Sequence, residues 1–576
     1  MEFSFVRTIL LFYFYFQFFI MIQTKSVVET ISKTHEVFNQ VPILENYNLY
    51  RSNSILKESV KRYAADWAID RLLQFGKECG SSEVMKWATQ ANENSPLLHT
   101  HDRCGNRIDE VEFHPAWHRL MNLSIKNELH SLPWVKPQAG AHVARAALMM
   151  LLAETELGHL CPISMTFSIV PALKAQEDVA SQWLPKILSN QYDSRFIPAS
   201  QKKGIICGMA MTEKQGGSDV RANTTKAMPI NGGGSGNEYL ITGHKWFCSA
   251  PMSDAFLMLA QAPEGLSCFL LPRFTPDEKR NHFYIQRLKD KLGNRSNASS
   301  EVEFNGAWAS MIGEEGRGIA TIIEMVNHTR LDCIIASAGL MHQATTQAIH
   351  HCTHRSAFGK KLIDQPLMLN VLADLSLETE AAILLTMRLA HSFDEKKNNE
   401  QEAAFSRIVT PIAKYWICKR TPNLVYEALE CHGGNGFVKE SIMPRLYQEA
   451  PLYSVWEGSG NVICLDVLRV IKKEPAVIQT LIAEFDKAKG LNVLFDSFAK
   501  KIIDEIQDAV LNEFHARYTV ERLALALQGA LMIQHSSSEA ASVFCNSRLA
   551  ENIGKTYGTI STKADYKNII NRMWTE

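Results

Sequence analysis

The sequence has almost no excess charge, since 60 lysines and arginines face 61 aspartates and glutamates, a formal net charge of −1. A protein-wide field that would steer nucleic acid or an acidic membrane is therefore excluded, although a local patch is not. The 12 cysteines include no Cys-x-x-Cys pair and are scattered from Cys79 to Cys545. This scatter indicates small, reduced core residues instead of disulfides or a metal site. We expect a cytoplasmic protein without a metal, with a mitochondrial location as the alternative.

Long apolar runs are also scarce, and the one candidate lies in residues 1–34. This segment is rich in Phe, Tyr, Leu and Ile, but Arg7, Thr8 and Gln17 interrupt it. The uninterrupted length falls below the roughly 20 residues that span a bilayer, so no stable membrane span is expected. No small-residue cleavage site follows, and the segment is not Arg-rich. Three interpretations remain: a membrane-associating leader, an organelle presequence, or, as we favour, a mis-assigned start with Met21 as the working initiator.

The pattern of helix and strand signals changes twice along the chain. A length of 576 residues exceeds what one hydrophobic core supports, so several domains are expected. Residues 35–205 have a helical pattern, and residues 206–312 hold short β-type runs between Gly- or Pro-containing turns. The helical pattern returns in residues 313–473 and continues in an extension over residues 474–576. The predicted fold class is therefore mainly α with a central β domain.

A polar loop, Met209-Ala210-Met211-Thr212-Glu213-Lys214-Gln215-Gly216-Gly217-Ser218-Asp219-Val220, opens the β region. Paired glycines let backbone N–H groups approach an anion closely, and the Thr and Ser hydroxyls add donors. The loop contains neither Gly-x-Gly-x-x-Gly nor Gly-Lys-Ser/Thr, which excludes a dinucleotide fingerprint or a Walker loop here. By composition alone, a simple tight loop is the favoured interpretation.

The sequence of this loop resembles the flavin-binding signature of acyl-CoA dehydrogenases, in particular the AidB-like subgroup, named for a bacterial alkylation-response protein. The resemblance continues through residues 243–249, 287–298 and 444–447, and it covers about residues 35–473. It implies an N-terminal helical domain, a β-barrel-like domain and a C-terminal four-helix bundle, here followed by an extra C-terminal helical domain. The order of helix and strand signals agrees with this fold.

The resemblance implies an FAD site with Glu457 as the catalytic base. In the family, such a glutamate removes the α proton of an acyl-CoA while a hydride leaves the β carbon for flavin N5. A base of this kind works best when burial raises its pKa. The substrate-binding positions would be Ser218, Arg330 and Trp456. The positions that the resemblance assigns to FAD are Met211, Thr212, Gly217, Ser218, Trp246, Phe247, Cys248, Ser249, Arg355, Phe358, Gln365, Gly433, Gly434, Ser459 and Asn461.

Some of these positions imply partners. Arg355, Gln365, Gly433 and Gly434 match family positions that hold the FAD of a neighbouring subunit, and a guanidinium fork suits a pyrophosphate. A homodimer or homotetramer is therefore implied, together with an electron-transfer flavoprotein as electron acceptor.

Three positions depart from the family pattern. Asn327 stands where many members have an aspartate that meets the CoA pantetheine. Glu430 stands where a glutamine often contacts FAD, and Trp456 replaces the common tyrosine before the base. The bulkier indole is expected to narrow the acyl pocket.

The chain continues for 108 residues past Leu468. AidB-like proteins carry such an extension, so an alternative function is a stress-response flavoprotein that binds double-stranded DNA, with Arg469 at an implicated position. A third hypothesis for the function is a flavoprotein scaffold with little turnover. DNA binding should leave an excess of basic residues, yet residues 474–576 hold 11 basic and 13 acidic residues. The charge favours an extension that stabilises the oligomer, and α,β-dehydrogenation of an acyl-CoA remains the leading function.

Overall fold

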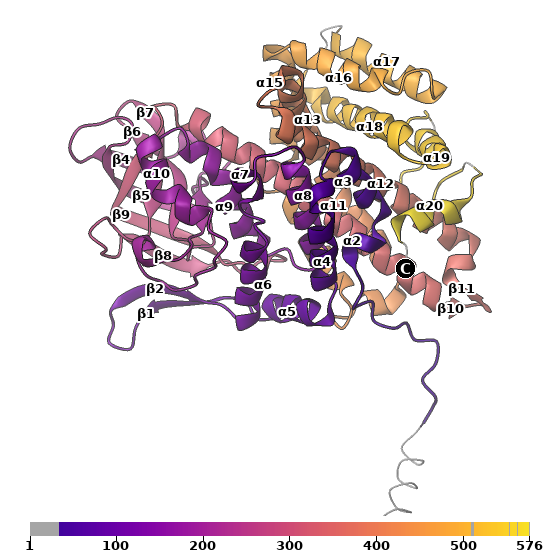
Figure 1. Cartoon of the computed structure of the whole chain (residues 1–576), viewed down its shortest axis with the longest axis horizontal. Helices are drawn as coiled ribbons and strands as arrows, with labels where there is room; N and C mark the ends of the chain where they lie inside the picture. Colours follow the sequence, from indigo (N-terminus) through magenta and orange to yellow (C-terminus); the bar gives the residue numbers. More distant parts are fainter. Residues whose placement is uncertain (1–33, 508–511, 552, 562, 575–576) are drawn as a thin grey trace, which may run out of the picture.

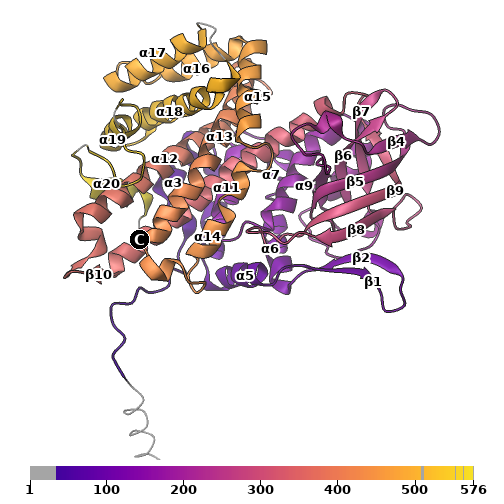
Figure 2. The same ribbon diagram turned by 180° about the vertical axis from the view of Figure 1, so that it is seen from behind.

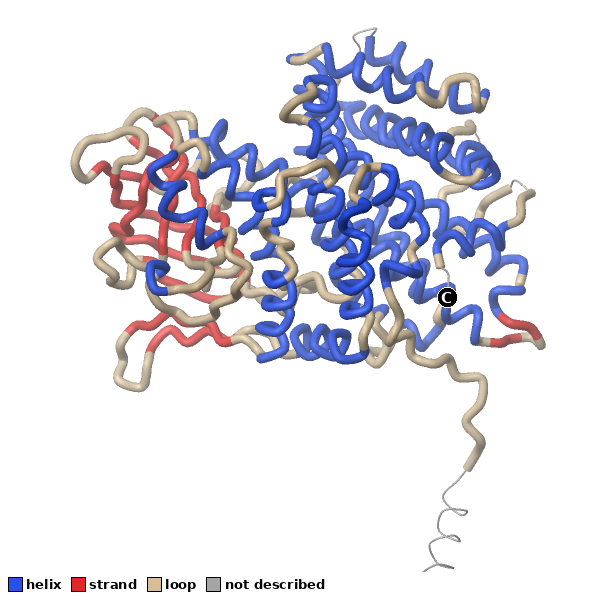
Figure 3. The backbone as a smooth tube through the Cα atoms, viewed as in Figure 1, coloured by secondary structure: helices blue, strands red, loops and turns tan. Residues whose placement is uncertain are grey.

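A computed structural model of the chain describes residues 34–507, 512–551, 553–561 and 563–574. Residues 1–33 of the expected leader lie outside this range. Figures 1 and 2 show a β domain at one end of a large helical body, and Figure 3 separates the strands from the helices by colour. Within the described ranges, no helix is long and apolar enough to cross a membrane.

The N-terminal region is mainly helical, and its helices α8 and α9 form its inner layer. Every residue of α8 is buried, as is nearly every residue of α9, because both sequences are apolar on all sides. Both helices pack against α11 of the bundle. The elements are α2 Leu49–Ser52, α3 Ser54–Arg62, η1 Asp66–Ala68, α4 Ile69–Cys79, α5 Ser82–Glu93, α6 Pro115–Lys126, α7 Leu132–Val135, α8 Ala141–Ala153, α9 Leu160–Leu173 and α10 Glu177–Ile187.

A β-hairpin interrupts this region, which the sequence pattern predicted to be helical throughout. Strands β1 (Leu97–His101) and β2 (Arg107–Glu112) pair antiparallel. The hairpin is held by the β domain: Arg107 donates to the carbonyl of Ile285 at 3.0 Å, and the Ile285 N–H donates to Asp109 at 3.1 Å. Because these contacts are tertiary and the strands are largely polar, the sequence shows no clear alternation of apolar and polar residues that would predict the two strands.

The β domain is a small closed barrel. Its sheet order is β3-β6-β4-β5-β9-β7, and β7 also pairs with β6, so five strands form a ring while β3 and β8 attach outside it. The short β-type runs expected within residues 206–312 correspond to these strands, among them β5, β6 and β7. The elements are η2 Ala199–Gln201, β3 Cys207–Ala210, η3 Val220–Ala222, β4 Lys226–Pro229, β5 Glu238–Ser249, β6 Ala255–Ala262, β7 Gly265–Pro272, β8 Phe283–Leu288 and β9 Ser299–Ile312.

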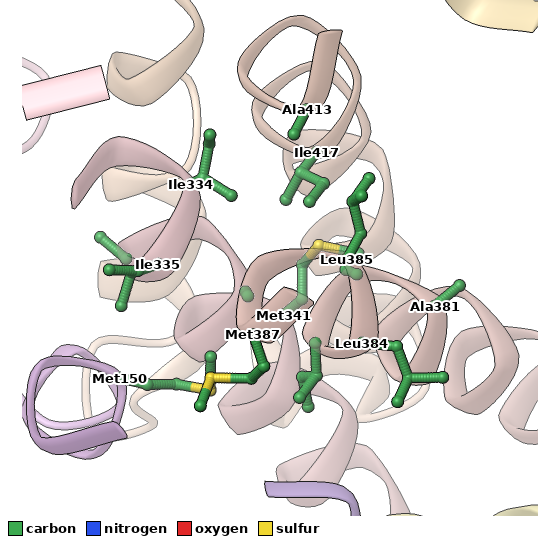
Figure 4. Packing of buried hydrophobic residues seen from close by; sticks show 14 of the residues in the cluster. Met150, Ile334, Ile335, Met341, Ala381, Leu384, Leu385, Met387, Ala413 and Ile417 are labelled. Atoms are coloured by element: carbon green, nitrogen blue, oxygen red, sulfur yellow. The ribbon is translucent and has the colours of Figure 1, made fainter. Parts of the chain in front are cut away.

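The helical bundle carries the main core. Figure 4 shows side chains of α8, α11, α12 and α13 meeting there, among them Met150, Met341, Leu385 and Ile417. The predicted fold class, mainly helical with a central β-barrel-like domain, is confirmed. The elements are α11 Gly318–His354, β10 Ser356–Ala357, β11 Lys360–Lys361, η4 Leu362–Asp364, α12 Pro366–Glu395, α13 Glu400–Glu430, η5 Gly433–Gly436, α14 Met443–Glu449, η6 Leu452–Ser454 and α15 Gly460–Lys473.

The C-terminal extension packs directly on the bundle, as Figure 2 shows. Its buried apolar residues belong to the same core cluster as those of the bundle. Polar contacts join the two parts as well: Trp416 Nε1 donates to Gln528 Oε1 at 2.9 Å, and Arg388 pairs with Glu484 at 3.1 Å. The elements are α16 Ala476–Asp486, α17 Val493–Gln507, η7 Glu513–His515, α18 Ala516–His535, α19 Ser538–Arg548 and α20 Tyr566–Met573.

Candidate active site

A cavity of about 1020 Å³ lies between the β domain, α9, α11 and the segment that carries Glu457. Its inner wall is mainly apolar, with Leu160, Met165, Val326 and Ala336 among its members. A cavity of this kind suits an apolar ligand with a few directed polar contacts. The predicted site residues that line it are Met211, Thr212, Gly217, Ser218, Phe247, Ser249, Arg330, Trp456, Glu457, Ser459 and Arg469.

Glu457 sits in a tight turn at the end of the cavity wall. Its backbone has φ +58° and that of Gly458 has φ +104°, both in the left-handed region. Thr329 Oγ1 donates to the Glu457 carboxylate at 2.9 Å. Arg330 Nε donates to the Glu457 carbonyl at 3.1 Å, and Arg330 Nη1 pairs with Asp466 at 2.8 Å. Arg330, predicted to bind substrate, thus has its charge paired within the protein.

Burial raises the pKa of the Glu457 carboxyl above its ordinary value. The hydrogen bond from Thr329 and the positive charges of Arg330 and Lys414 act in the opposite direction and favour the ionised form. The carboxyl therefore combines a basic character with an environment that still stabilises its charge. Those are the properties of a general base.

The polar loop is anchored by an ion pair that the sequence pattern did not reveal. Lys245 Nζ lies 2.8 Å from Glu213 Oε1, and both side chains are fully buried. Although burial alone would raise it, Lys245 and the hydrogen bonds from Thr224 hold the pKa of Glu213 at about 2. The loop folds back so tightly that a Cβ added at Gly217 would lie 2.5 Å from Thr212 Oγ1. Glycine is required there, and the hydroxyl-bearing loop is held rigidly against the cavity.

The residues at the end of β5 that were predicted to contact the flavin lie on two faces of the strand, since side chains alternate along a strand. Phe247 and Ser249 line the cavity. Cys248 is turned into the β-domain core, where burial raises the pKa of its thiol to about 12. Among the described residues that line the cavity, Trp246 is absent. Lys289 Nζ lies 3.4 Å from the centroid of the Trp246 ring.

The predicted FAD residues that follow α11 lie elsewhere. Arg355 follows the end of α11, where its guanidinium donates to the carbonyl of Asn39. Gln365 Nε2 donates to the Ala357 carbonyl at 3.1 Å, and Phe358, at the tip of the β10–β11 hairpin, is 98% exposed. None of these residues lines the cavity that contains Glu457. Gly433 and Gly434 likewise face open space, with nothing within 4 Å of an added Cβ.

The two groups are too far apart to hold one FAD within a single chain. Thr329, beside Glu457, and His354, beside Arg355, are 25 residues apart on α11, which corresponds to roughly 38 Å at 1.5 Å per residue. Figures 1 and 2 place the hairpin β10–β11 at the opposite end of the helical body from the β domain. A single FAD is much shorter than this distance.

The last predicted flavin contact, Asn461, is held by the C-terminal extension. Arg517 Nε, in the first turn of α18, donates to Asn461 Oδ1 at 2.8 Å. Ser459 precedes the first residue of α15 and is exposed. The extension thus reaches the segment directly after Glu457.

Arg517→Ala is expected to weaken FAD retention about 2- to 12-fold, the effect of losing one hydrogen bond of 0.5–1.5 kcal/mol. The reason is that the Asn461 amide would lose its orientation. Equilibrium dialysis of the deflavinated protein against FAD measures the change. Lys500→Ala, at an exposed position of the same extension, is the control and should bind FAD as the wild type does. Equal affinities of wild type and Arg517→Ala would contradict the prediction.

Three exposed basic residues, Arg221, Arg469 and Lys473, line the cavity together with the exposed Asp219, and Arg469 is also 3.4 Å from Asp466. Trp456, predicted to bind substrate, lines the wall, and within the described residues its buried indole N–H has no hydrogen-bond acceptor.

Sequence reasoning missed several residues that hold the site, namely Thr329, Lys414, Arg517 and the pair Glu213 and Lys245. Lys414 did leave a signal, because it is a single lysine in the apolar run Ile412-Ala413-Lys414-Tyr415-Trp416-Ile417.

Comparison with known proteins places these features in a family. The adaptive response protein AidB N-terminal domain matches residues 39–194, the acyl-CoA dehydrogenase middle domain residues 208–307, and the acyl-CoA dehydrogenase C-terminal domain residues 316–472. The chain is 45% identical over 515 residues to the putative acyl-CoA dehydrogenase AidB of Escherichia coli (strain K12), covering 89% of this chain and 94% of that one. It is 29% identical over 538 residues to acyl-CoA dehydrogenase family member 11 of Caenorhabditis elegans, covering 86% and 85%.

Solved structures agree. The crystal structure of Caenorhabditis elegans ACDH-11 in complex with C11-CoA superposes with a TM-score of 0.82 at 27% identity, covering 91% of this chain and 94% of that one. An acyl-CoA dehydrogenase from Bacillus anthracis complexed with FAD shares the fold, with a TM-score of 0.63 at 16% identity and 89% of each chain covered.

The chain therefore belongs to the acyl-CoA dehydrogenase family of oxidoreductases, whose members bind FAD. Within that family it is AidB-like, both in its N-terminal domain and over most of its length. The resemblance inferred from the polar loop and the Glu457 segment is confirmed.

Proposed function

We propose that this protein catalyses the flavin-dependent α,β-dehydrogenation of an acyl-CoA thioester, with Glu457 as the base that removes the α proton. The observation that carries the proposal is the position of Glu457, a carboxyl with a raised pKa that lines a largely apolar cavity opposite the polar loop. The C11-CoA bound to the Caenorhabditis elegans relative supports a ligand of this class.

The residues at the cavity fit FAD as the cofactor. Thr212 and Ser218 offer hydroxyl groups on a loop whose tight turn requires Gly217, so that hydroxyls and backbone N–H groups can approach the flavin closely. Phe247 and Ser249 would cover it from the strand end. When bound, FAD supplies the acceptor for the hydride that leaves the β carbon.

The chain's own residues would handle the proton. Glu457 takes the α proton as a carboxylate and becomes the neutral acid, while Thr329 and the Arg330 contact keep its turn in place. The apolar wall excludes water, which strengthens the basicity of a desolvated carboxylate. Loss of one proton and one hydride converts the acyl thioester to its α,β-unsaturated form. We further propose an electron-transfer flavoprotein as the acceptor that restores the oxidised cofactor.

The separation of the two predicted FAD halves supports a shared cofactor. In our proposal, the cavity residues hold the flavin ring, and Arg355, Gln365 and Gly433 of a second copy hold the adenosine half. An assembly of at least two chains then completes each site. The exposed Phe358 at the hairpin tip is consistent with a surface that a second copy covers.

The exposed basic residues of the cavity favour CoA over DNA as the partner of Arg469. Arg221, Arg469 and Lys473 belong to the cavity lining, where cations would neutralise the phosphates of a CoA whose acyl chain lies inside. Salt-dependent retention of duplex DNA by the full-length protein, lost in Arg469→Ala, would instead favour the alternative function.

The decisive test is anaerobic mixing of the purified holoprotein with saturated acyl-CoAs from butyryl-CoA to palmitoyl-CoA. Loss of the visible flavin absorbance with at least one chain length is expected, together with formation of the enoyl product. Unchanged absorbance with every member of the series would exclude the proposed activity.

The rate of this flavin reduction is expected to rise with pH, with an acid limb whose midpoint lies above 4.5, the ordinary value for glutamate. Only the ionised carboxylate accepts a proton, and burial raises the pKa of Glu457, so a higher pH is needed to ionise it. The charged groups that face it are Arg330 and Lys414; burial raises the thiol pKa of Cys161, to about 12, and of Cys333, so both stay neutral. Stopped-flow rates at subsaturating substrate measure the limb, and a pH-independent rate would contradict the prediction.

A further inference from the structure

Lys414 is a buried cation that contacts the turn of the base from behind. It lies on α13 and is 1% exposed. Its ammonium donates to the carbonyl of Trp456 at 2.8 Å and also to the carbonyl of Gly458. These carbonyls belong to the residues directly before and after Glu457.

With Arg330, this lysine completes a row of contacts. The carbonyls of Trp456, Glu457 and Gly458 are consecutive, and each accepts a hydrogen bond from a buried cation. The turn they belong to is strained, since Glu457 is a non-glycine residue at φ +58°. A conformation of this kind costs about 1–3 kcal/mol and persists only where surrounding contacts determine it. The ammonium of Lys414, bonded to both flanking carbonyls, supplies such contacts.

The charge of Lys414 is not neutralised by a structural ion pair. Within the described residues, no carboxylate lies within ion-pair distance of its ammonium, whereas Arg330 is paired with Asp466 at 2.8 Å. A buried charge without a partner is unfavourable unless another charge compensates it. The carboxyl group of Glu457, the residue between these two carbonyls, is a group whose ionised form the charge of Lys414 favours, after the hydrogen bond from Thr329 and the charge of Arg330.

We propose that Lys414 is a positioning residue for the catalytic base: it fixes the carbonyl groups of Trp456 and Gly458, the residues before and after Glu457, and supplies a buried positive charge that favours the ionised carboxylate. Lys414 touches neither substrate nor cofactor in this proposal and acts through Glu457. The inference rests on the proposed function only in its use of Glu457 as the base.

The test is an infrared titration of the FAD-bound protein without substrate. The carbonyl stretch of protonated Glu457 is identified as the band that Glu457→Gln lacks, and its pH midpoint is compared between variants. Lys414→Met, which keeps the length of the side chain without its charge, should shift the midpoint upward by about 1–3 units, the range for loss of a nearby opposite charge. Lys414→Arg should stay near the wild-type value. Equal midpoints in wild type and Lys414→Met would overturn the proposal.

Near-ultraviolet circular dichroism and FAD content verify that each variant is correctly folded. Lys414→Gln, which keeps a donor without a charge, replaces Lys414→Met in the titration if the latter does not fold. In flavin reduction by an acyl-CoA, the neutral variant should lose rate at neutral pH and regain most of it at high pH. A rate that is reduced by the same factor at all pH values would show that Lys414 has only a structural role and does not act on the ionisation of Glu457. If none of the acyl-CoAs reduces the flavin of the wild type, the proposed function fails, but the titration still decides the role of Lys414.

Discussion

Glu457→Gln is expected to slow flavin reduction by an acyl-CoA by about 10²–10⁴-fold, the usual contribution of a positioned general base. The amide cannot accept the α proton, yet it has nearly the shape of the carboxylate. Thr329 can still donate to the amide oxygen, and the Arg330 contact is to the backbone carbonyl. The effect should therefore appear in the rate of the chemical step and not in the content of FAD. Anaerobic stopped-flow absorbance measures it.

The control for this experiment is Thr329→Val, which keeps the carboxylate and removes its hydrogen bond. Loss of that bond is expected to change the pH midpoint of the reaction far more than its maximum rate. A Glu457→Gln variant that reduces the flavin as fast as the wild type would place the base elsewhere in the cavity and leave Glu457 without its proposed role.

Arg548→Met is expected to destabilise the protein by about 3–5 kcal/mol, the usual effect of breaking a buried ion pair from one side. Arg548 lies on α19 of the extension and pairs with Asp374 and Glu378 of α12, whose side chains are only 2% and 3% exposed. Glu378 keeps its bond to Arg420, but Asp374 would retain only the N–H of Gly558. Urea unfolding followed by circular dichroism measures the change.

Two comparisons make this result specific. Lys489→Met removes a partner from an exposed pair with Asp486 in the same extension, and exposed pairs contribute only about 0–1 kcal/mol. The double variant Arg548→Met with Asp374→Asn should recover much of the lost stability, because no unpaired buried charge remains. Unfolding of Arg548→Met at the wild-type urea concentration would show that the extension is not held by this pair.

Local patterns in the sequence were sufficient to predict the architecture. The helical pattern of residues 313–473 and the short β-type runs of residues 206–312 each depend on residues close together in the chain, and each was predicted with the right type of structure. A short motif also carries the prediction that Glu457 is the base. The hairpin β1–β2 escaped prediction because its stability comes from Ile285, far along the chain.

The sequence by itself identified Glu457 as the candidate base, whereas the surroundings of this residue were decided by the tertiary structure. Periodicity and motifs identify residues whose meaning is local, such as a glycine in a tight loop or a glutamate in a short turn. The contacts of Lys414 with the Glu457 turn, of Arg517 with Asn461, and of the Glu213–Lys245 pair join residues that are distant in the chain. Only the folded chain brings such groups within hydrogen-bond distance, and only there does burial turn an ordinary carboxyl into a base with a raised pKa.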